Sequence, residues 1–79
     1  MKFSERLVKL RDYRGMTQSG LAAEAGITTR GLQNYETTER RPKGEYLSKL
    51  AKALKVPESA LLSDEGFARF FANVSVNYG

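Results

Sequence analysis

The stretch from Thr17 to Glu36, TQSGLAAEAGITTRGLQNYE, constrains the fold of this chain more than any other. It predicts two short helices joined by a tight turn. Thr17 and Thr28 each stand just before one of these helices, where a hydroxyl oxygen can accept a hydrogen bond from an unpaired backbone N–H. Gly26 lies between the helices and can adopt the left-handed conformation that ends the first one.

The apolar residues of this stretch have helical spacing. Leu21, Ala22 and Ala25 share one face of the first helix, expected at about 18–25, and Leu32 and Tyr35 share one face of the second. Two capped helices that meet across a glycine turn form a helix-turn-helix motif.

The same periodicity predicts three more helices, which makes the fold class all-α. The first runs from 3 to 14, the next from 44 to 54 after a polar loop at 37–43, and the last from Pro57 to 62. Their apolar faces are Phe3, Leu7 and Leu10 in the first, Leu47, Leu50, Ala51 and Leu54 in the next, and Ala60, Leu61 and Leu62 in the last.

The C-terminal segment has a different pattern, so we divide the chain into a domain at 1–63 and a tail at 64–79. Residues 63–66, Ser-Asp-Glu-Gly, are interpreted as a break in the helical pattern. Three phenylalanines beyond it are spaced for one helical face. Val74, Val76 and Tyr78 then alternate with polar residues, which is the period of a strand. Because no other stretch could pair with it, this strand is expected to be disordered or to pair with another chain.

Composition excludes several classes of function. Cysteine and histidine are absent, so there is no disulfide, no thiolate or imidazole metal ligand and no histidine general base. We expect no catalytic residues, no cofactor and no metal, and we exclude an enzyme. No apolar run is long enough for a membrane span, so a cytoplasmic protein without a membrane partner is expected. No small-molecule site is indicated.

The charge favours an anionic partner. The net charge is +4, and the basic residues are concentrated in 1–14 and around the motif, whereas the tail is close to neutral. Such a balance suits nucleic acid, although many small domains are modestly basic.

Two glycines inside the motif's helices, Gly20 and Gly31, have two interpretations. Each costs about 0.5–1 kcal/mol relative to alanine in a helix. Either the backbone comes close to something at these positions, or the domain tolerates the cost.

In combination these segments resemble the lambda-repressor-like, or Cro/XRE, family of helix-turn-helix regulators of the phage-repressor type. The resemblance covers about 3–62 and rests on Gly15-Met16-Thr17-Gln18, Leu21-Ala22, Gly26-Ile27-Thr28, Leu32 with Tyr35-Glu36, Arg41-Pro42, and the run 47–54 before Val56. It implies a compact bundle of five helices that binds double-stranded DNA as a homodimer on a near-palindromic operator, associated with the bacterial nucleoid. Gly20 and Thr38 depart from the family pattern, which often has glycine at the latter position.

The second helix of the motif is expected to read base edges in the major groove. Its outward residues are Thr29, Arg30, Gln33 and Asn34. Arginine can bind guanine through two hydrogen bonds, glutamine and asparagine can bind adenine in the same way, and the threonine methyl can contact thymine. Tyr35 and Glu36 are assigned to structure rather than to DNA.

Phosphate contacts fix register without reading sequence. The resemblance assigns such a contact to Gln18, at the positive N-terminal end of the motif's first helix. The other predicted phosphate-binding residues are Arg11, Thr17, Thr28, Arg40, Arg41 and Lys43.

One domain of this size contacts a single half-site, so a dimer is expected. The predicted dimer contacts are Leu61, Phe67, Phe70, Phe71, Val74 and Val76. The alternatives for the tail are a frayed terminus or the start of a longer protein.

Two functions remain open from sequence. The leading one is a DNA-binding transcriptional repressor. The other is a protein-interaction module, such as an antitoxin that binds a partner protein as well as its own operator, and the tail aromatics would support it.

Overall fold

The two helices of the motif form as predicted in a computed structural model that describes residues 1–78, with side chains described to residue 74. They are α2 (Gln18–Ala25) and α3 (Thr29–Thr37). Gly26 ends α2 with φ of +70°, and the N–H of Ile27 donates to the Ala22 carbonyl across the turn at 3.0 Å. The left-handed glycine thus turns the chain directly into the next helix.

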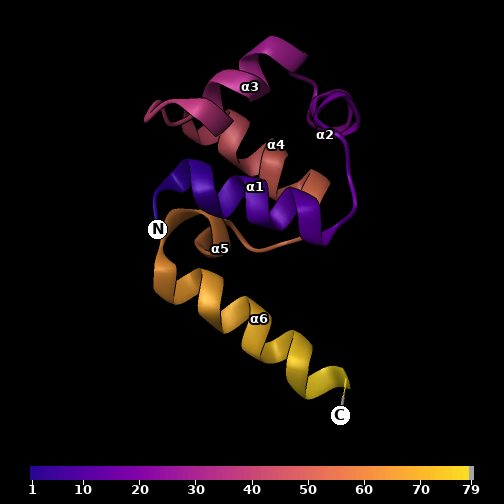
Figure 1. The fold of residues 1–79 in the computed structure, drawn as a ribbon, viewed down its shortest axis with the longest axis vertical. Coiled ribbons are helices and arrows are strands. Elements are labelled where there is room, and N and C mark those ends of the chain that lie inside the picture. Colours follow the sequence, from indigo (N-terminus) through magenta and orange to yellow (C-terminus); the bar gives the residue numbers. More distant parts are fainter. Residues whose placement is uncertain (79) are drawn as a thin grey trace.

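Four other helices complete the described chain (Figure 1). They are α1 (Phe3–Tyr13), α4 (Gly44–Leu54), α5 (Glu58–Leu62) and α6 (Asp64–Tyr78). Helix α2 packs on α3 and α4, and α1 packs on α3 and α5. The five-helix part of the fold is therefore as expected. Among the described residues the structure is entirely helical, without strands.

One apolar core is shared by the five helices α1 to α5. Its fully buried leucines come from all five helices, so each helix depends on the others for burial. The buried apolar residues are Phe3, Leu7, Leu10, Leu21, Ala22, Ala25, Leu32, Leu47, Leu50, Ala51, Leu54, Val56, Ala60 and Leu61.

The two motif glycines each lie at the third position of a capped helix. The N–H groups of Gly20 and Gly31 donate to the hydroxyls of Thr17 and Thr28, each at 2.9 Å. A Cβ atom would lie 3.1 Å from the first hydroxyl oxygen and 3.0 Å from the second. The close neighbour at each glycine is thus the hydroxyl that caps the same helix.

The predicted break at 63–66 is wrong, because helix α6 begins at Asp64. The Ser63 hydroxyl accepts a hydrogen bond from the Gly66 N–H at 2.9 Å, so Ser63 caps α6. Asp64 and Glu65 occupy its first turn, where carboxylates are favourable. Gly66 is buried, and a Cβ there would collide with the carbonyl group of Ser59. This glycine permits the close approach of α5 and α6 rather than interrupting a helix.

The predicted strand at Val74–Tyr78 is also wrong, because α6 continues to Tyr78. A lone strand would leave its backbone groups unpaired, whereas a helix pairs them internally. Phe67, Phe70, Phe71 and Val74 also satisfy helical spacing, and neither proline nor glycine interrupts the segment before Gly79. The helix therefore propagates through the alternating residues.

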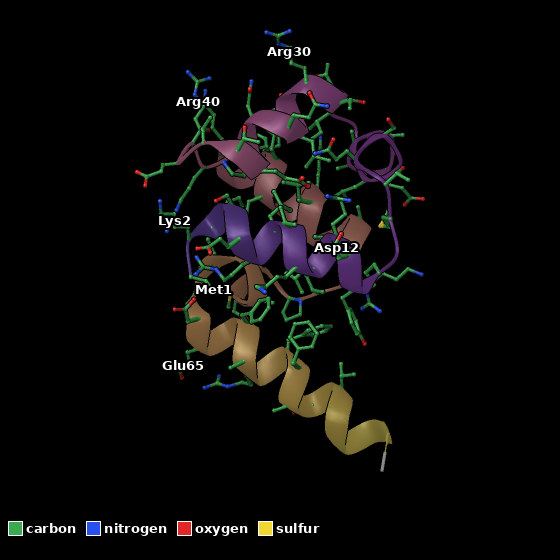
Figure 2. The ribbon with its side chains drawn as sticks, in the orientation of Figure 1. Met1, Lys2, Asp12, Arg30, Arg40 and Glu65 are labelled. Atoms are coloured by element: carbon green, nitrogen blue, oxygen red, sulfur yellow. The ribbon has the colours of Figure 1, made fainter. Side chains whose placement is uncertain are left out.

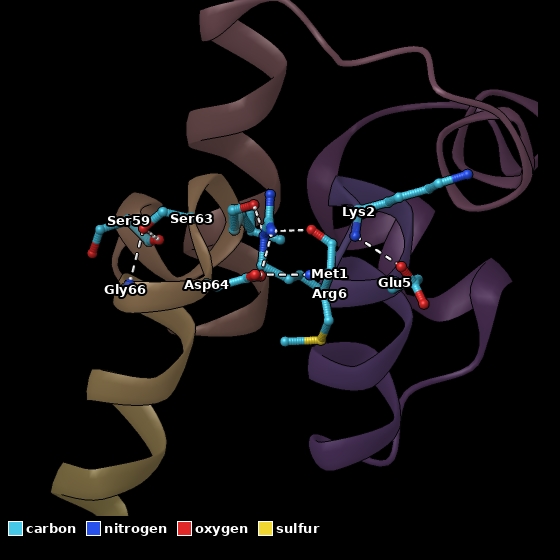
Figure 3. Close-up of polar contacts among 9 residues, drawn as sticks. Met1, Lys2, Glu5, Arg6, Ser59, Ser63, Asp64 and Gly66 are labelled. Atoms are coloured by element: carbon cyan, nitrogen blue, oxygen red, sulfur yellow. Dashed lines mark hydrogen bonds and ion pairs between the residues drawn. The ribbon is translucent and has the colours of Figure 1, made fainter.

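A buried arginine joins the start of α6 to α1 (Figure 3). The Arg6 side chain is 4% exposed, and it donates to the Leu61 carbonyl at 2.7 Å and to the Asp64 carboxylate at 2.8 Å. The N-terminal amine of Met1 also donates to Asp64, at 2.8 Å. The amine and Arg6 together hold the pKa of Asp64 below its ordinary range.

A second arginine, Arg14, joins the ends of α1 and α4. Its guanidinium donates to the carbonyls of Leu54 at 2.7 Å and Lys55 at 2.8 Å, which are free at the end of α4. It also lies over the rings of Tyr13 and Phe70, at 5.1 and 5.7 Å from their centroids. Arg14 thus connects α1, α4 and α6.

Lys55 provides a test of helix termination, since it is the one residue other than glycine with positive φ among residues 1–78, at +57°. We expect Lys55→Gly to raise the free energy of unfolding by about 0.5–1 kcal/mol, because glycine removes the steric cost of this conformation. The control Lys52→Gly, within α4, should lower it by about 1 kcal/mol. Urea denaturation measures both, and equal destabilisation by the two variants would contradict the prediction.

Candidate nucleic-acid interface

Three of the four predicted base-reading residues are exposed on α3. Arg30, Gln33 and Asn34 are exposed, whereas Thr29 is half-buried. Their helix packs its opposite side, with Leu32, into the core. Figure 2 shows Arg30 projecting from the end of the molecule that lies opposite α6. The outward face of α3 is therefore available to a ligand.

Helix α3 ends without the glycine that the family often has. The Thr37 hydroxyl donates to the Gln33 carbonyl at 2.8 Å, and the Thr38 hydroxyl donates to the Asn34 carbonyl at 2.6 Å. The Thr38 backbone is extended, with φ of −122°. Two hydroxyls thus add hydrogen bonds to carbonyls of the last helical turn, and the loop to α4 leaves in an extended direction.

A basic pocket lies between the end of α3 and the start of α4. Its volume is about 300 Å³, and it brings the predicted base reader Asn34 together with three predicted phosphate-binding residues. Its charged lining side chains are all cationic. The lining residues are Gly31, Asn34, Tyr35, Arg40, Arg41, Lys43 and Tyr46. Tyr46 was missed from the sequence, because an exposed tyrosine in a first helical turn carries no distinctive pattern.

A polar network connects the core to the exposed face of α3. The Arg11 Nε donates to Glu36 Oε2 at 2.7 Å, and Gln18 Nε2 donates to Glu36 Oε1 at 2.9 Å. Gln33 Nε2 donates in turn to Gln18 Oε1 at 3.3 Å. One predicted phosphate-binding residue and one predicted base reader are thus in direct contact.

The ion pair at the base of this network is shielded from solvent. The side chains of Arg11 and Glu36 are 15% and 3% exposed. Arg11 also donates to the Met16 carbonyl at 2.9 Å. The hydrogen bond to Glu36 raises the pKa of Arg11 above its ordinary value, so the guanidinium remains charged. The phosphate contact predicted for Arg11 stays a prediction, but most of its guanidinium is used internally.

Thr17 and Thr28, also predicted to contact phosphate, cap α2 and α3. Each hydroxyl oxygen accepts from its own helix, which leaves the hydroxyl hydrogen to donate to an anion. Arg40, Arg41 and Lys43 are exposed. The predicted phosphate-binding residues other than Arg11 therefore lie at or near the surface.

The predicted dimer contacts divide into two sets. Leu61 is fully buried, so we assign it to the core. Phe67, Phe70, Phe71 and Val74 are half-buried on α6. The Phe70 and Phe71 rings contact Tyr13 edge to face, at 5.9 and 5.0 Å between centroids. The side chain of Val76 lies outside the described residues.

The described residues were compared with the requirements of a membrane-spanning helix and of a metal site. None of their helices combines the length and the apolar character required to cross a lipid bilayer. Within the same residues, no group of three or more carboxylate, imidazole or thiol side chains is arranged to hold a metal ion.

The fold, with α2 and α3 joined by a left-handed glycine and α3 exposed on one side, is that of a helix-turn-helix domain. The chain matches the helix-turn-helix family over residues 7–61, so it belongs to this family, of the Cro/C1 type.

Three relatives are similar over most of this chain. The HTH-type transcriptional repressor RghR of Bacillus subtilis is 36% identical over 66 residues, which cover 82% of this chain and 49% of RghR. The cryptic phage CTXphi transcriptional repressor RstR of Vibrio cholerae is 39% identical, covering 71% of this chain and 50% of RstR. The SPbeta prophage-derived HTH-type transcriptional regulator YonR of B. subtilis is 38% identical, covering 76% and 56%. The chain thus spans about half the length of these relatives.

The buried ion pair can be tested by substitution. We expect Glu36→Ala to lower the free energy of unfolding by about 1.5–3 kcal/mol, because it leaves the partly buried Arg11 charge without its partner. The double variant Arg11→Met/Glu36→Leu should recover part of this loss, since neither charge remains. The control is Glu39→Ala, which breaks an exposed pair with Lys2 and should change stability by less than about 1 kcal/mol. A Glu36→Ala effect as small as that of the control, measured in urea, would contradict a structural role for the pair.

Proposed function

We propose that this domain is a transcriptional regulator that binds double-stranded DNA with α3 in the major groove, acting as a dimeric repressor on a near-palindromic operator. The observation that carries the proposal is the exposed polar face of α3 beside a pocket with three cations. The major groove of B-DNA is wide enough for one helix, and its base edges offer donors and acceptors that amide and guanidinium groups can match.

The residues of α3 have distinct roles in this proposal. Arg30 projects away from the body in Figure 2, and its guanidinium can donate two hydrogen bonds to the O6 and N7 atoms of guanine. Asn34 is exposed one turn further along the helix and can bind adenine. Thr29 offers a methyl group for thymine. These contacts would supply sequence specificity.

The surroundings of α3 would supply affinity. Arg40, Arg41 and Lys43 lie beside its C-terminal half, and Gln18 lies at the N-terminal end of α2. Both groups of residues are adjacent to the base-reading face, so they can contact the phosphates that border one groove. The N–H groups and the positive dipole at the start of α2 favour an anion at Gln18. Such contacts fix the register of the protein on the duplex.

The repressor role is supported by the relatives. RghR and RstR are named as transcriptional repressors, and each is similar to most of this chain. A repressor needs only to occupy a site, which a single DNA-binding domain with a dimer contact can do.

Helix α6 is the proposed dimer contact. Figure 1 shows that it lies at the opposite end of the longest axis from α3 and runs obliquely away from the body. For both α3 helices of a dimer to face one duplex, the two-fold axis must run roughly along this long axis. Val74 is half-buried and lies in the far half of α6, which no other helix covers in Figure 1, so it is available for such a contact.

Two substitutions distinguish the residues proposed to read bases from those proposed to bind phosphates. We expect Arg30→Ala to relax the preference at one operator position by about 1–3 kcal/mol. Arg41→Ala should weaken binding to all sequences alike and reduce the slope of log K against log salt by about 0.9. Anisotropy titrations on an operator and on its single-base variants, at several salt concentrations, measure both effects. Uniform loss of affinity in both variants would contradict the assignment.

The dimer contact is tested on α6. We expect Val74→Asp to abolish self-association at micromolar concentration, because a carboxylate would enter an apolar contact. The control Ala68→Asp places the same charge at an exposed position of α6 and should leave the dimer intact. Sedimentation equilibrium gives the oligomeric state. A wild-type monomer, or a Val74→Asp variant that dimerises as the wild type does, would refute dimerisation through this face.

A further inference from the structure

We infer that Glu36, acting through Gln18, fixes the orientation of the Gln33 amide, so that Gln33 selects adenine over guanine at its operator position. This inference rests on the proposed function, because it requires α3 to lie in the major groove. It concerns what the polar network does to a base-reading side chain, beyond the fact that Gln33 is exposed.

The carboxylate of Glu36 forms an ion pair with Arg11. An ionised carboxylate only accepts hydrogen bonds. Its Oε2 atom accepts from Arg11 at 2.7 Å, and its Oε1 atom accepts from Gln18 Nε2 at 2.9 Å. Gln18 must therefore turn its NH₂ group towards Glu36, and its carbonyl oxygen necessarily faces the other way.

The orientation of the Gln18 amide determines the orientation of the Gln33 amide on α3. The Gln18 Oε1 atom is also only an acceptor, and it lies 3.3 Å from Gln33 Nε2. Gln33 must turn its NH₂ group to Gln18 in order to make this bond. Reversing either amide would place two acceptors, or two donors, against each other. The orientation of both amides thus follows from one buried negative charge.

The bond to Gln18 limits the hydrogen-bonding groups that Gln33 can offer to DNA. One of its two N–H groups is used by Gln18, so one N–H and the carbonyl oxygen remain. Adenine presents a donor at N6 and an acceptor at N7, which match this pair. Guanine presents acceptors at both O6 and N7, and Gln33 can donate to only one of them. A glutamine without this constraint could offer both N–H groups to guanine.

Burial makes the constraint effective. Glu36 is 3% exposed and bound to Arg11, whereas Gln18 is half-buried and Gln33 is exposed. The orientation is therefore set in the interior and transmitted outward, where water cannot replace the charged acceptor. Glu36 and Gln18 are positioning residues for Gln33, and Gln18 retains a second N–H for a phosphate.

Gln18→Met is the variant that isolates this effect, because substitution of Glu36 would also break the ion pair with Arg11. Methionine is close to glutamine in size and removes the hydrogen bonds on both sides. Bound sites would be selected from random DNA by the wild type, Gln18→Met, Gln33→Ala and Arg41→Ala. Sequencing then gives the base ratio at each position, which a uniform change in affinity does not alter.

We expect the wild type to favour adenine over guanine roughly 5- to 150-fold at one position, which Gln33→Ala identifies by losing the preference there. Gln18→Met should reduce the ratio at this same position about tenfold, the equivalent of one hydrogen bond, and leave the ratios elsewhere unchanged. Arg41→Ala should leave all ratios unchanged.

The outcomes separate this inference from the function on which it rests. A Gln18→Met variant with the wild-type ratio at the Gln33 position would overturn the orienting role while leaving DNA reading by α3 intact. A wild-type preference for guanine at that position would also overturn it. If no variant selected any sequence, or if Gln33→Ala changed no position, base reading by Gln33 itself would fail.

Discussion

The buried ion pair between Arg11 and Glu36 is the interaction on which the geometry of the motif depends. It joins α1 to the last turn of α3, two helices whose pairing residues lie 25 positions apart in sequence. Placing two charges in the interior is costly unless their hydrogen bonds are complete. Here the Met16 carbonyl and the Gln18 amide complete them. The pair therefore sets the position of α3 on the core and the conformation of a side chain at the surface.

Much of the fold could be predicted from sequence, because its signals are local. The hydroxyls of Thr17 and Thr28, the left-handed Gly26 and the apolar periodicity each act within one or two helical turns. They defined α2 and α3 nearly to the residue. The exposed face of α3 followed from the same periodicity, since a residue that does not belong to the apolar stripe must lie on the other side.

The parts that could not be predicted depend on contacts distant in sequence or on signals with two meanings. Nothing local pairs Arg11 with Glu36, or brings the Arg14 guanidinium to the end of α4. Ser63-Asp64-Glu65-Gly66 contains a serine cap and two acids, which start a helix, but its glycine suggested a break. Only the packing of α5 shows why glycine stands there. The strand prediction relied on alternation, a weak signal where no partner strand exists.

The close contact of Gly66 with Ser59, together with Phe70 and Phe71 against Tyr13, fixes the direction in which α6 leaves the body. Helix α6 continues from Gly66 to Tyr78, so its far end lies about 18 Å beyond that glycine at about 1.5 Å per residue. A change of about 10° in that direction would move the far end by about 3 Å, since the displacement grows with the length of the helix. In a dimer joined at these far ends, the distance between the two α3 helices would then depend on the direction of α6. Small substitutions near Ser59 could retune which spacing of half-sites is recognised without any change in α3.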